Sequence, residues 1–173
     1  MRRVALLLAM GLSLATAAHA GLRLGDTLPA VTLADWQGEP MKLGDLRGKV
    51  VILDFWASWC EVCRTALPEL DALARRHRED EVIVVAINID RDRARADQFL
   101  SHYLPRRHLM LLHDPEAELM ARLGADGMPT LYVVDRDGIV RDVKAGYEPG
   151  QLDSLESLLK RLLTPPSEAA EQR

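Results

Sequence analysis

One run of apolar residues that ends close to a pair of cysteines constrains this chain more than any other feature. The run spans Val50 to Phe55 with Asp54 as its one polar member, and the chain's two cysteines, Cys60 and Cys63, follow it. Such a run is typical of a strand buried on both faces of a sheet, ending at a solvent-facing rim. The free N–H groups of a following helix would stabilise a thiolate on Cys60. We therefore expect thiol–disulfide exchange at this junction.

The pattern on either side of this junction predicts a single α/β domain. Strands and helices alternate first and a hairpin comes late, so we expect a mixed sheet with helices on both faces. Predicted helices cover residues 61–78, 92–104, 115–123 and 151–163. Predicted strands cover residues 49–56, 81–89, 109–112, 130–134 and 139–143, and residues 29–33 and 41–43 form an N-terminal hairpin.

The first twenty residues have the pattern of an export signal. Arginines at positions 2 and 3 precede an apolar stretch that ends in Ala18-His19-Ala20. We expect cleavage after Ala20, one folded domain over residues 21–163 and a disordered tail over residues 164–173. An uncleaved membrane anchor is the alternative, because the stretch approaches the roughly 17 to 25 residues that span a bilayer. Both interpretations place the domain outside the cytoplasm, in the periplasm.

Charge and cysteine spacing exclude several classes of function. With 22 basic and 26 acidic residues the net charge is −4, which disfavours nucleic acid as a partner. C-x-x-C closes too short a loop to brace a fold, so a reactive pair is favoured over an inert disulfide or two buried thiols. The histidines have no spacing that completes a zinc site, and haem attachment needs a histidine where Arg64 follows Cys63. We expect no metal and no cofactor beyond the disulfide itself.

Asp54 is the one acidic residue inside the predicted strand. Burial there should raise the pKa of its carboxyl group, which suits a proton acceptor for Cys63. The alternative is a carboxylate at the sheet edge, bonded to backbone.

Several motifs together resemble the thioredoxin superfamily. They are Trp59-Cys60-Glu61-Val62-Cys63 after a strand, Pro68, and Gly127-Met128-Pro129-Thr130 before a strand. The export signal, the N-terminal hairpin and the extra stretch at residues 92–125 make the chain similar to the TlpA/ResA/CcmG (DsbE)-like extracytoplasmic thioredoxins. The resemblance implies a thioredoxin fold: a central mixed β-sheet flanked by helices, with an N-terminal β-hairpin and a βα-type insertion before a cis proline.

The resemblance also implies a role for each motif residue. Cys60 is an exposed nucleophile that forms a mixed disulfide, and Cys63 resolves it; the position of Cys60 nearer the helix N-terminus indicates the same order. Pro129 is cis and faces the cysteines, so that the backbone of Met128 pairs with an extended substrate. Trp59 and Thr130 belong to the same docking surface. Met128 as a simple core side chain is the alternative.

Glu61 is the residue expected to tune the redox potential. A helix N-terminus stabilises a thiolate by up to about 2 kcal/mol, and an exposed glutamate opposes it by about 0.9 kcal/mol. Cys-Glu-x-Cys resembles the motif of ResA-type proteins, although Ala66 replaces their second glutamate. The lysine that often accompanies the thioredoxin aspartate is replaced by Ala86. Because the helix and Glu61 effects largely offset, and nothing in Glu61-Val62 supplies the extra positive charge of a strongly oxidising pair, we expect a relatively reducing couple.

The predicted function is therefore an extracytoplasmic thiol-disulfide oxidoreductase that reduces disulfides in exported proteins, of the cytochrome c maturation or metallochaperone type. The resemblance implies a membrane thiol donor of the CcdA or DsbD kind, and we expect a monomer. A non-catalytic copper-binding module of the same fold is the alternative, although it would need a longer cysteine spacing and a dedicated histidine. A peroxiredoxin-like peroxidase would need a Pro-x-x-x-Thr-x-x-Cys motif, which the chain lacks.

Overall fold

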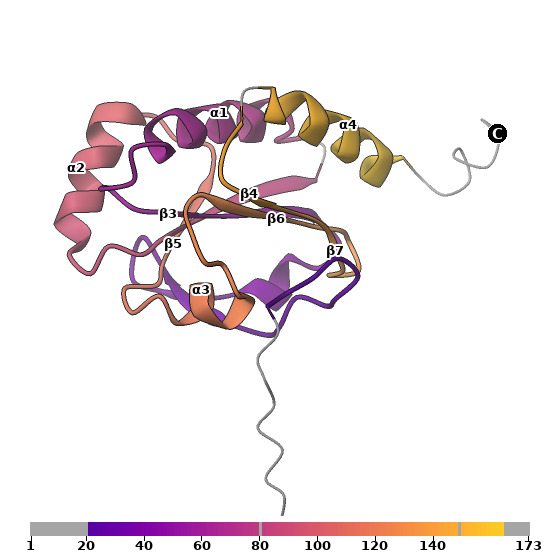
Figure 1. The fold of residues 1–173 in the computed structure, drawn as a ribbon, viewed down its shortest axis with the longest axis horizontal. Coiled ribbons are helices and arrows are strands. Elements are labelled where there is room, and N and C mark those ends of the chain that lie inside the picture. Colours follow the sequence, from indigo (N-terminus) through magenta and orange to yellow (C-terminus); the bar gives the residue numbers. More distant parts are fainter. Residues whose placement is uncertain (1–20, 80, 149, 165–173) are drawn as a thin grey trace, which may run out of the picture.

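A seven-stranded sheet forms the centre of the domain in the computed structural model, which describes residues 21–79, 81–148 and 150–164 (Figure 1). The predicted leader and tail lie outside these residues, except for Thr164. The strands are β1 (Thr32–Asp35), β2 (Pro40–Lys42), β3 (Val50–Trp56), β4 (Val82–Asn88), β5 (Met110–His113), β6 (Thr130–Val134) and β7 (Val140–Ala145). The helices are η1 (Leu43–Leu46), α1 (Cys63–Arg76), α2 (Arg93–Tyr103), α3 (Glu118–Leu123) and α4 (Gln151–Leu163).

The sheet is mixed, as predicted. Its strand order is β2-β1-β5-β4-β3-β6-β7. β3, β4 and β5 run parallel to one another, whereas β6 pairs antiparallel with β3 and β7 pairs antiparallel with β6. The parallel strands β3 and β4 therefore end at the same edge of the sheet, and α1 starts there.

Helices cover both faces of the sheet (Figure 1). Alternate residues of β3 point to opposite faces, and all seven are buried. Ile52 and Trp56 pack into the cluster that α1, α2 and α4 cover. Leu53 and Phe55 pack into the opposite cluster, which α3 and η1 cover. Burial on both faces explains why this strand is a nearly continuous apolar run.

The predicted N-terminal hairpin is present, with different bounds. β1 pairs antiparallel with β2 and joins the sheet through β5, where Ala34 lies opposite His113. The carboxylate of Asp35 accepts hydrogen bonds from the backbone N–H groups of Gln37 and Glu39, so the turn begins where β1 ends. Leu43 was predicted to end the second strand, but it begins η1.

Helix α3 also begins later than the sequence predicts. Ala117 has a left-handed backbone with φ of 53°, so the regular helix cannot start before Glu118. The buried carboxylate of Asp114 accepts hydrogen bonds from the N–H groups of Glu118 and of the two residues after it, which satisfies the first turn. The helix ends at Gly124, as predicted. No helix in the described part of the chain is long and apolar enough to cross a membrane.

Candidate active site

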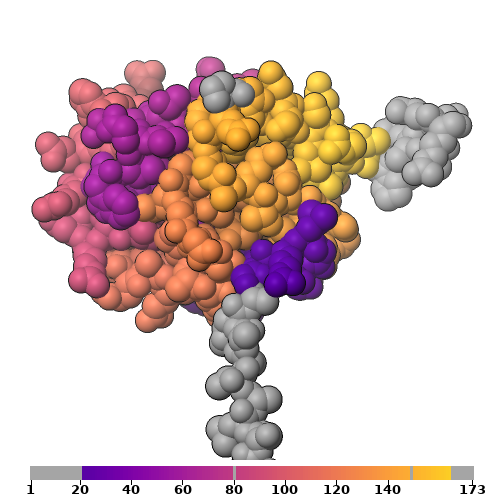
Figure 2. All heavy atoms as spheres, in the orientation of Figure 1, coloured from indigo at the N-terminus to yellow at the C-terminus, as the bar shows by residue number. Residues whose placement is uncertain are grey.

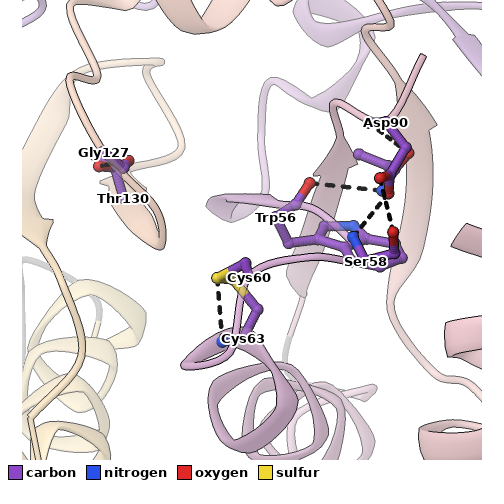
Figure 3. The surroundings of a disulfide bond; sticks show 8 residues. Trp56, Ser58, Cys60, Cys63, Asp90, Gly127 and Thr130 are labelled. Carbon is purple, nitrogen blue, oxygen red and sulfur yellow. Dashed lines mark hydrogen bonds between the residues drawn. A yellow bond between two sulfur atoms is a disulfide. The ribbon is translucent and has the colours of Figure 1, made fainter.

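A disulfide joins Cys60 and Cys63 at the point where β3 gives way to α1 (Figure 3). Cys63 is the first residue of α1. Its backbone N–H donates a hydrogen bond to Sγ of Cys60, with 3.2 Å between nitrogen and sulfur. A free N–H group of the helix N-terminus is therefore directed at the sulfur that is predicted to carry the negative charge.

The accessibility of the two cysteines corrects one prediction. Cys60 was expected to be exposed, but only 7% of its surface is accessible, while Cys63 has none. The exposure of Cys60 is lower than expected because its side chain packs into the same apolar cluster as Trp56. The neighbouring Trp59, which is 64% exposed, lies at the surface instead. The predicted order of exposure is right. A reacting thiolate therefore has to approach through the small accessible part of Cys60.

Asp54 is buried on the face of the sheet that α1 covers. It is 1% exposed, and neither of its carboxylate oxygens has a hydrogen-bond partner in the described ranges. Its cross-strand neighbours are Ala86 and Leu131, both of which belong to the cluster on the α1 face. Burial without a donor or a cation raises the pKa of the Asp54 carboxyl group well above its usual value. The predicted burial and pKa direction are both confirmed.

The peptide bond between Met128 and Pro129 is cis, as predicted. The loop is fixed by Thr130, whose Oγ1 donates a hydrogen bond of 2.7 Å to the carbonyl oxygen of Gly127. The N–H of Gly146 donates to the carbonyl oxygen of Pro129 at 2.8 Å. Met128 is half-buried and packs against the apolar cluster that contains both cysteines. The proline loop and the disulfide therefore both contact this cluster.

Glu61 lies on the surface and is paired. Its Oε2 lies 2.7 Å from a guanidinium nitrogen of Arg64, three residues later in the chain. From the sequence, Glu61 was expected to be an isolated negative charge that opposes a thiolate. Arg64 places a positive charge beside Glu61 that was not counted, and the effect of Glu61 on the thiolate stays a prediction.

Asp90 is a site residue that the sequence analysis did not single out. It follows β4 and is 3% exposed. Its carboxylate accepts hydrogen bonds from the backbone N–H of Ser58 at 2.7 Å and from the Ser58 hydroxyl at 2.8 Å. Nδ2 of Asn88 donates a third hydrogen bond at 2.8 Å. Nε2 of His113 lies 2.7 Å from the Asp90 carbonyl oxygen. Figure 3 shows Asp90 beside Ser58, two residues before Cys60. Asp90 therefore fixes the loop that carries the reactive cysteine.

A signal for this contact is present in the sequence. Asn88 and Asp90 are polar residues at the end of an apolar strand, and parallel strands bring their carboxyl ends together at one edge. Among the residues that the structure describes, no group of three or more His, Cys, Asp or Glu side chains is placed to hold a metal ion.

Comparison with known proteins gives consistent matches over nearly the whole domain. The sequence model of the Redoxin family matches residues 23–159. The chain is 32% identical over 167 residues to the thiol:disulfide interchange protein DsbE of Pseudomonas aeruginosa, covering 94% of this chain and 90% of that protein. It is 26% identical over 141 residues to the thiol-disulfide oxidoreductase ResA of Bacillus thuringiensis, covering 82% of this chain and 79% of that one.

A solved structure is similar as well. The crystal structure of a protein described as a DsbE-type thiol:disulfide interchange protein, from Chlorobium tepidum, superposes with a TM-score of 0.78 at 33% identity. The superposition covers 83% of this chain and 100% of that one. These matches confirm the resemblance that the cysteine and proline motifs predicted.

Replacing Asp90 tests whether it fixes the cysteine loop. We expect Asp90→Ala to lower the free energy of unfolding by about 1–3 kcal/mol, because the N–H of Ser58 loses a buried acceptor. In a double-mutant cycle with Ser58→Ala, urea unfolding should give a coupling energy of about 1 kcal/mol. Glu116→Ala, which removes an exposed carboxylate, serves as the control and should change stability by less than about 0.5 kcal/mol. A coupling energy near zero would contradict the assignment.

Proposed function

Because the chain belongs to the Redoxin family and is a thiol-disulfide oxidoreductase, we propose that it reduces disulfides in exported proteins. The observation that carries this proposal is the disulfide at the N-terminus of α1, in which Cys60 alone reaches the surface. Proteins of cytochrome c maturation or metallochaperones would be its substrates. The export signal predicted in the first twenty residues supports a site of action in the periplasm.

The reaction would proceed by two thiol–disulfide exchanges. In the reduced protein, the thiolate of Cys60 attacks one sulfur of the substrate disulfide, and the other substrate sulfur leaves as a thiolate. The thiolate of Cys63 then attacks Sγ of Cys60, which releases the second substrate sulfur and forms the Cys60–Cys63 disulfide. Two electrons pass to the substrate. The N–H of Cys63 is placed to stabilise the Cys60 thiolate before the first step.

Asp54 would accept the proton of Cys63 before the second exchange. It lies on the sheet face that α1 covers, and Cys63 begins α1 within the same apolar cluster. The raised pKa of the Asp54 carboxyl group brings its affinity for a proton closer to that of a thiol, which favours transfer.

Substrate docking would use the surface around the disulfide. Trp59 is 64% exposed and directly precedes Cys60. The backbone of Met128 would pair with an extended substrate segment beside Pro129 and Thr130, as in strand addition.

The oxidised protein would be reduced again by a membrane thiol transporter of the CcdA or DsbD kind. It would act as a monomer, with no cofactor other than its own disulfide. We infer net reduction of substrates because Arg64, which follows Cys63, is ion-paired with Glu61 at 2.7 Å, so its charge is partly offset beside the disulfide. A strongly oxidising pair needs a thiolate stabilised well beyond what a helix N-terminus alone provides.

Insulin reduction tests the activity directly. The wild-type protein should catalyse the reduction of insulin disulfides by dithiothreitol, and Cys60→Ser should abolish catalysis because a serine hydroxyl forms no nucleophilic thiolate. Arg75→Gln, an exposed change at the far end of α1, should retain full activity. Stoichiometric copper binding to the reduced protein without insulin reduction would contradict the proposal and favour a metal-binding module.

The direction of electron flow is tested by titration in glutathione redox buffers. We expect a reduction potential well below about −120 mV, the value of a strongly oxidising pair. Arg64→Gln should lower the potential by about 10–20 mV, because Glu61 then opposes the thiolate unpaired. Glu61→Gln should raise it by a similar amount. A wild-type potential near about −120 mV would exclude a reductase.

Replacing Asp54 tests both its burial and its proposed role. In the folded protein its pKa lies above the unfolded value, so above about pH 4 the unfolded chain releases this proton first and stability falls as the pH rises. Asp54→Asn removes that loss. Urea unfolding should show the variant to be more stable than wild type at pH 7, by about 1.4 kcal/mol for each unit of pKa elevation, with the difference vanishing towards pH 3.

The same variant should slow the second exchange alone. In single turnover, the mixed disulfide should form at the wild-type rate and then decay at least about 100-fold more slowly, because Cys63 loses its proton acceptor. Unchanged decay would remove Asp54 from the mechanism while leaving the disulfide chemistry intact.

A further inference from the structure

A cavity of about 740 Å³ lies beside the cysteine loop, between that loop and α2. In Figure 2 the purple segment that contains the start of α1 lies next to the rose segment that contains α2, on the left of the molecule. Its lining includes the aromatic and basic side chains Trp59, Arg64, Arg95, Phe99, His102 and Tyr103. The cavity is distinct from the proline loop, which contributes no residue to its lining.

Aromatic rings form much of the cavity wall. Phe99 is 6% exposed, and its ring centroid lies 4.7 Å from that of Tyr103. The ring of His102 lies 4.6 Å from Tyr103 in an edge-to-face arrangement. Trp59 is more exposed than either Phe99 or Tyr103. These faces offer stacking surfaces for a planar or aromatic group of a bound chain.

The polar groups of the cavity wall favour an anion. Arg64 and Arg95 carry guanidinium groups, His102 adds ring nitrogens, and no Asp or Glu lines the cavity within the described residues. Glu61 contacts Arg64 at 2.7 Å and Asp92 lies 3.9 Å from Arg95, both from outside the lining. A guanidinium group has five N–H donors, so each arginine retains capacity for a second carboxylate. The chain as a whole carries a net charge of −4, so these basic groups on the cavity wall are opposite in sign to the net charge of the protein.

We propose that this cavity binds an acidic segment of the substrate protein, next to the cysteine that reacts with Cys60. The inference rests on the proposed function and adds the substrate's local chemistry: carboxylate side chains, with an aromatic side chain able to stack on Trp59 or Tyr103. Trp59 lines the cavity and directly precedes Cys60, which does not line it itself, so a segment seated in the cavity lies one residue away from the reactive cysteine. Ser58, which also lines the cavity, is held by the carboxylate of Asp90, so this wall is fixed before the substrate arrives.

Peptide substrates that differ only in charge provide the test. Each peptide carries one cysteine as a mixed disulfide with 2-mercaptoethanol, next to a tyrosine and flanked by three Glu, three Gln or three Lys residues. Second-order rate constants are measured with the dithiothreitol-reduced protein after removal of excess reductant. We expect the Glu peptide to react about five-fold faster than the Gln peptide, and the Lys peptide to react most slowly. The preference should decrease with added salt, because exposed charges are screened.

Two variants decide whether the preference comes from this cavity. Arg95→Gln combined with His102→Gln should reduce the ratio of the Glu and Gln peptide rates from about five towards one. Arg75→Gln removes an exposed arginine elsewhere on the protein and should keep the wild-type ratio. A ratio that survives the double variant would overturn the assignment to this cavity.

The test separates this inference from the proposed function. Equal rates for all three peptides would overturn the acidic-segment inference while leaving the protein a disulfide reductase. If the protein reduced none of the three peptides and also failed to reduce the small neutral disulfide of 2-mercaptoethanol, the proposed function itself would be overturned.

Discussion

The burial of β3 on both faces is the constraint on which the rest of the structure depends. All seven residues of this strand are buried, and β4 and β6 flank it on its two sides. The strand therefore has a fixed position at the centre of the sheet. After its carboxyl end the chain leaves the core and approaches the surface. Cys60 and Cys63 lie at that point of emergence, where a helix N-terminus begins. The position of the reactive pair is thus a consequence of how the core is filled.

Asp54 stands apart from the other buried aspartates. Asp71, Asp90 and Asp114 each accept hydrogen bonds from backbone N–H groups, and each holds a loop or a helix start in place. Asp54 has no such partner in the part of the chain that the structure describes. A buried carboxyl group with no structural bond lowers stability when it is ionised, so its presence at the centre of the sheet is better explained by chemistry than by packing.

The features that the sequence predicted well are those that depend on short stretches of chain. The apolar run at β3 correctly predicted a strand covered on both faces, because a strand buried on both sides has few positions that tolerate a polar residue. The amphipathic pattern of α4 gave its bounds without error. The cis bond before Pro129 was predicted from the motif resemblance, since general frequencies of X–Pro bonds argue against it. Local pattern and motif were sufficient in these cases.

Features that depend on contacts between distant segments were missed. The bond between Asp90 and Ser58 requires two parallel strands to end together, which no single segment encodes. One contact between near residues was missed as well: Glu61 was treated as an isolated charge, although Arg64 three residues later pairs with it. The accessibility of Cys60 was overestimated because the neighbouring tryptophan and the apolar cluster beneath it were not considered together.

The small accessible part of Cys60 has a consequence for turnover. Cys63 is closed to solvent, so the protein has one entrance to its disulfide rather than two. The molecule that delivers electrons and the molecule that receives them must both react at this entrance. A mixed disulfide with one of them occupies Sγ of Cys60 and excludes a mixed disulfide with the other, so the two reactions take turns at a single sulfur.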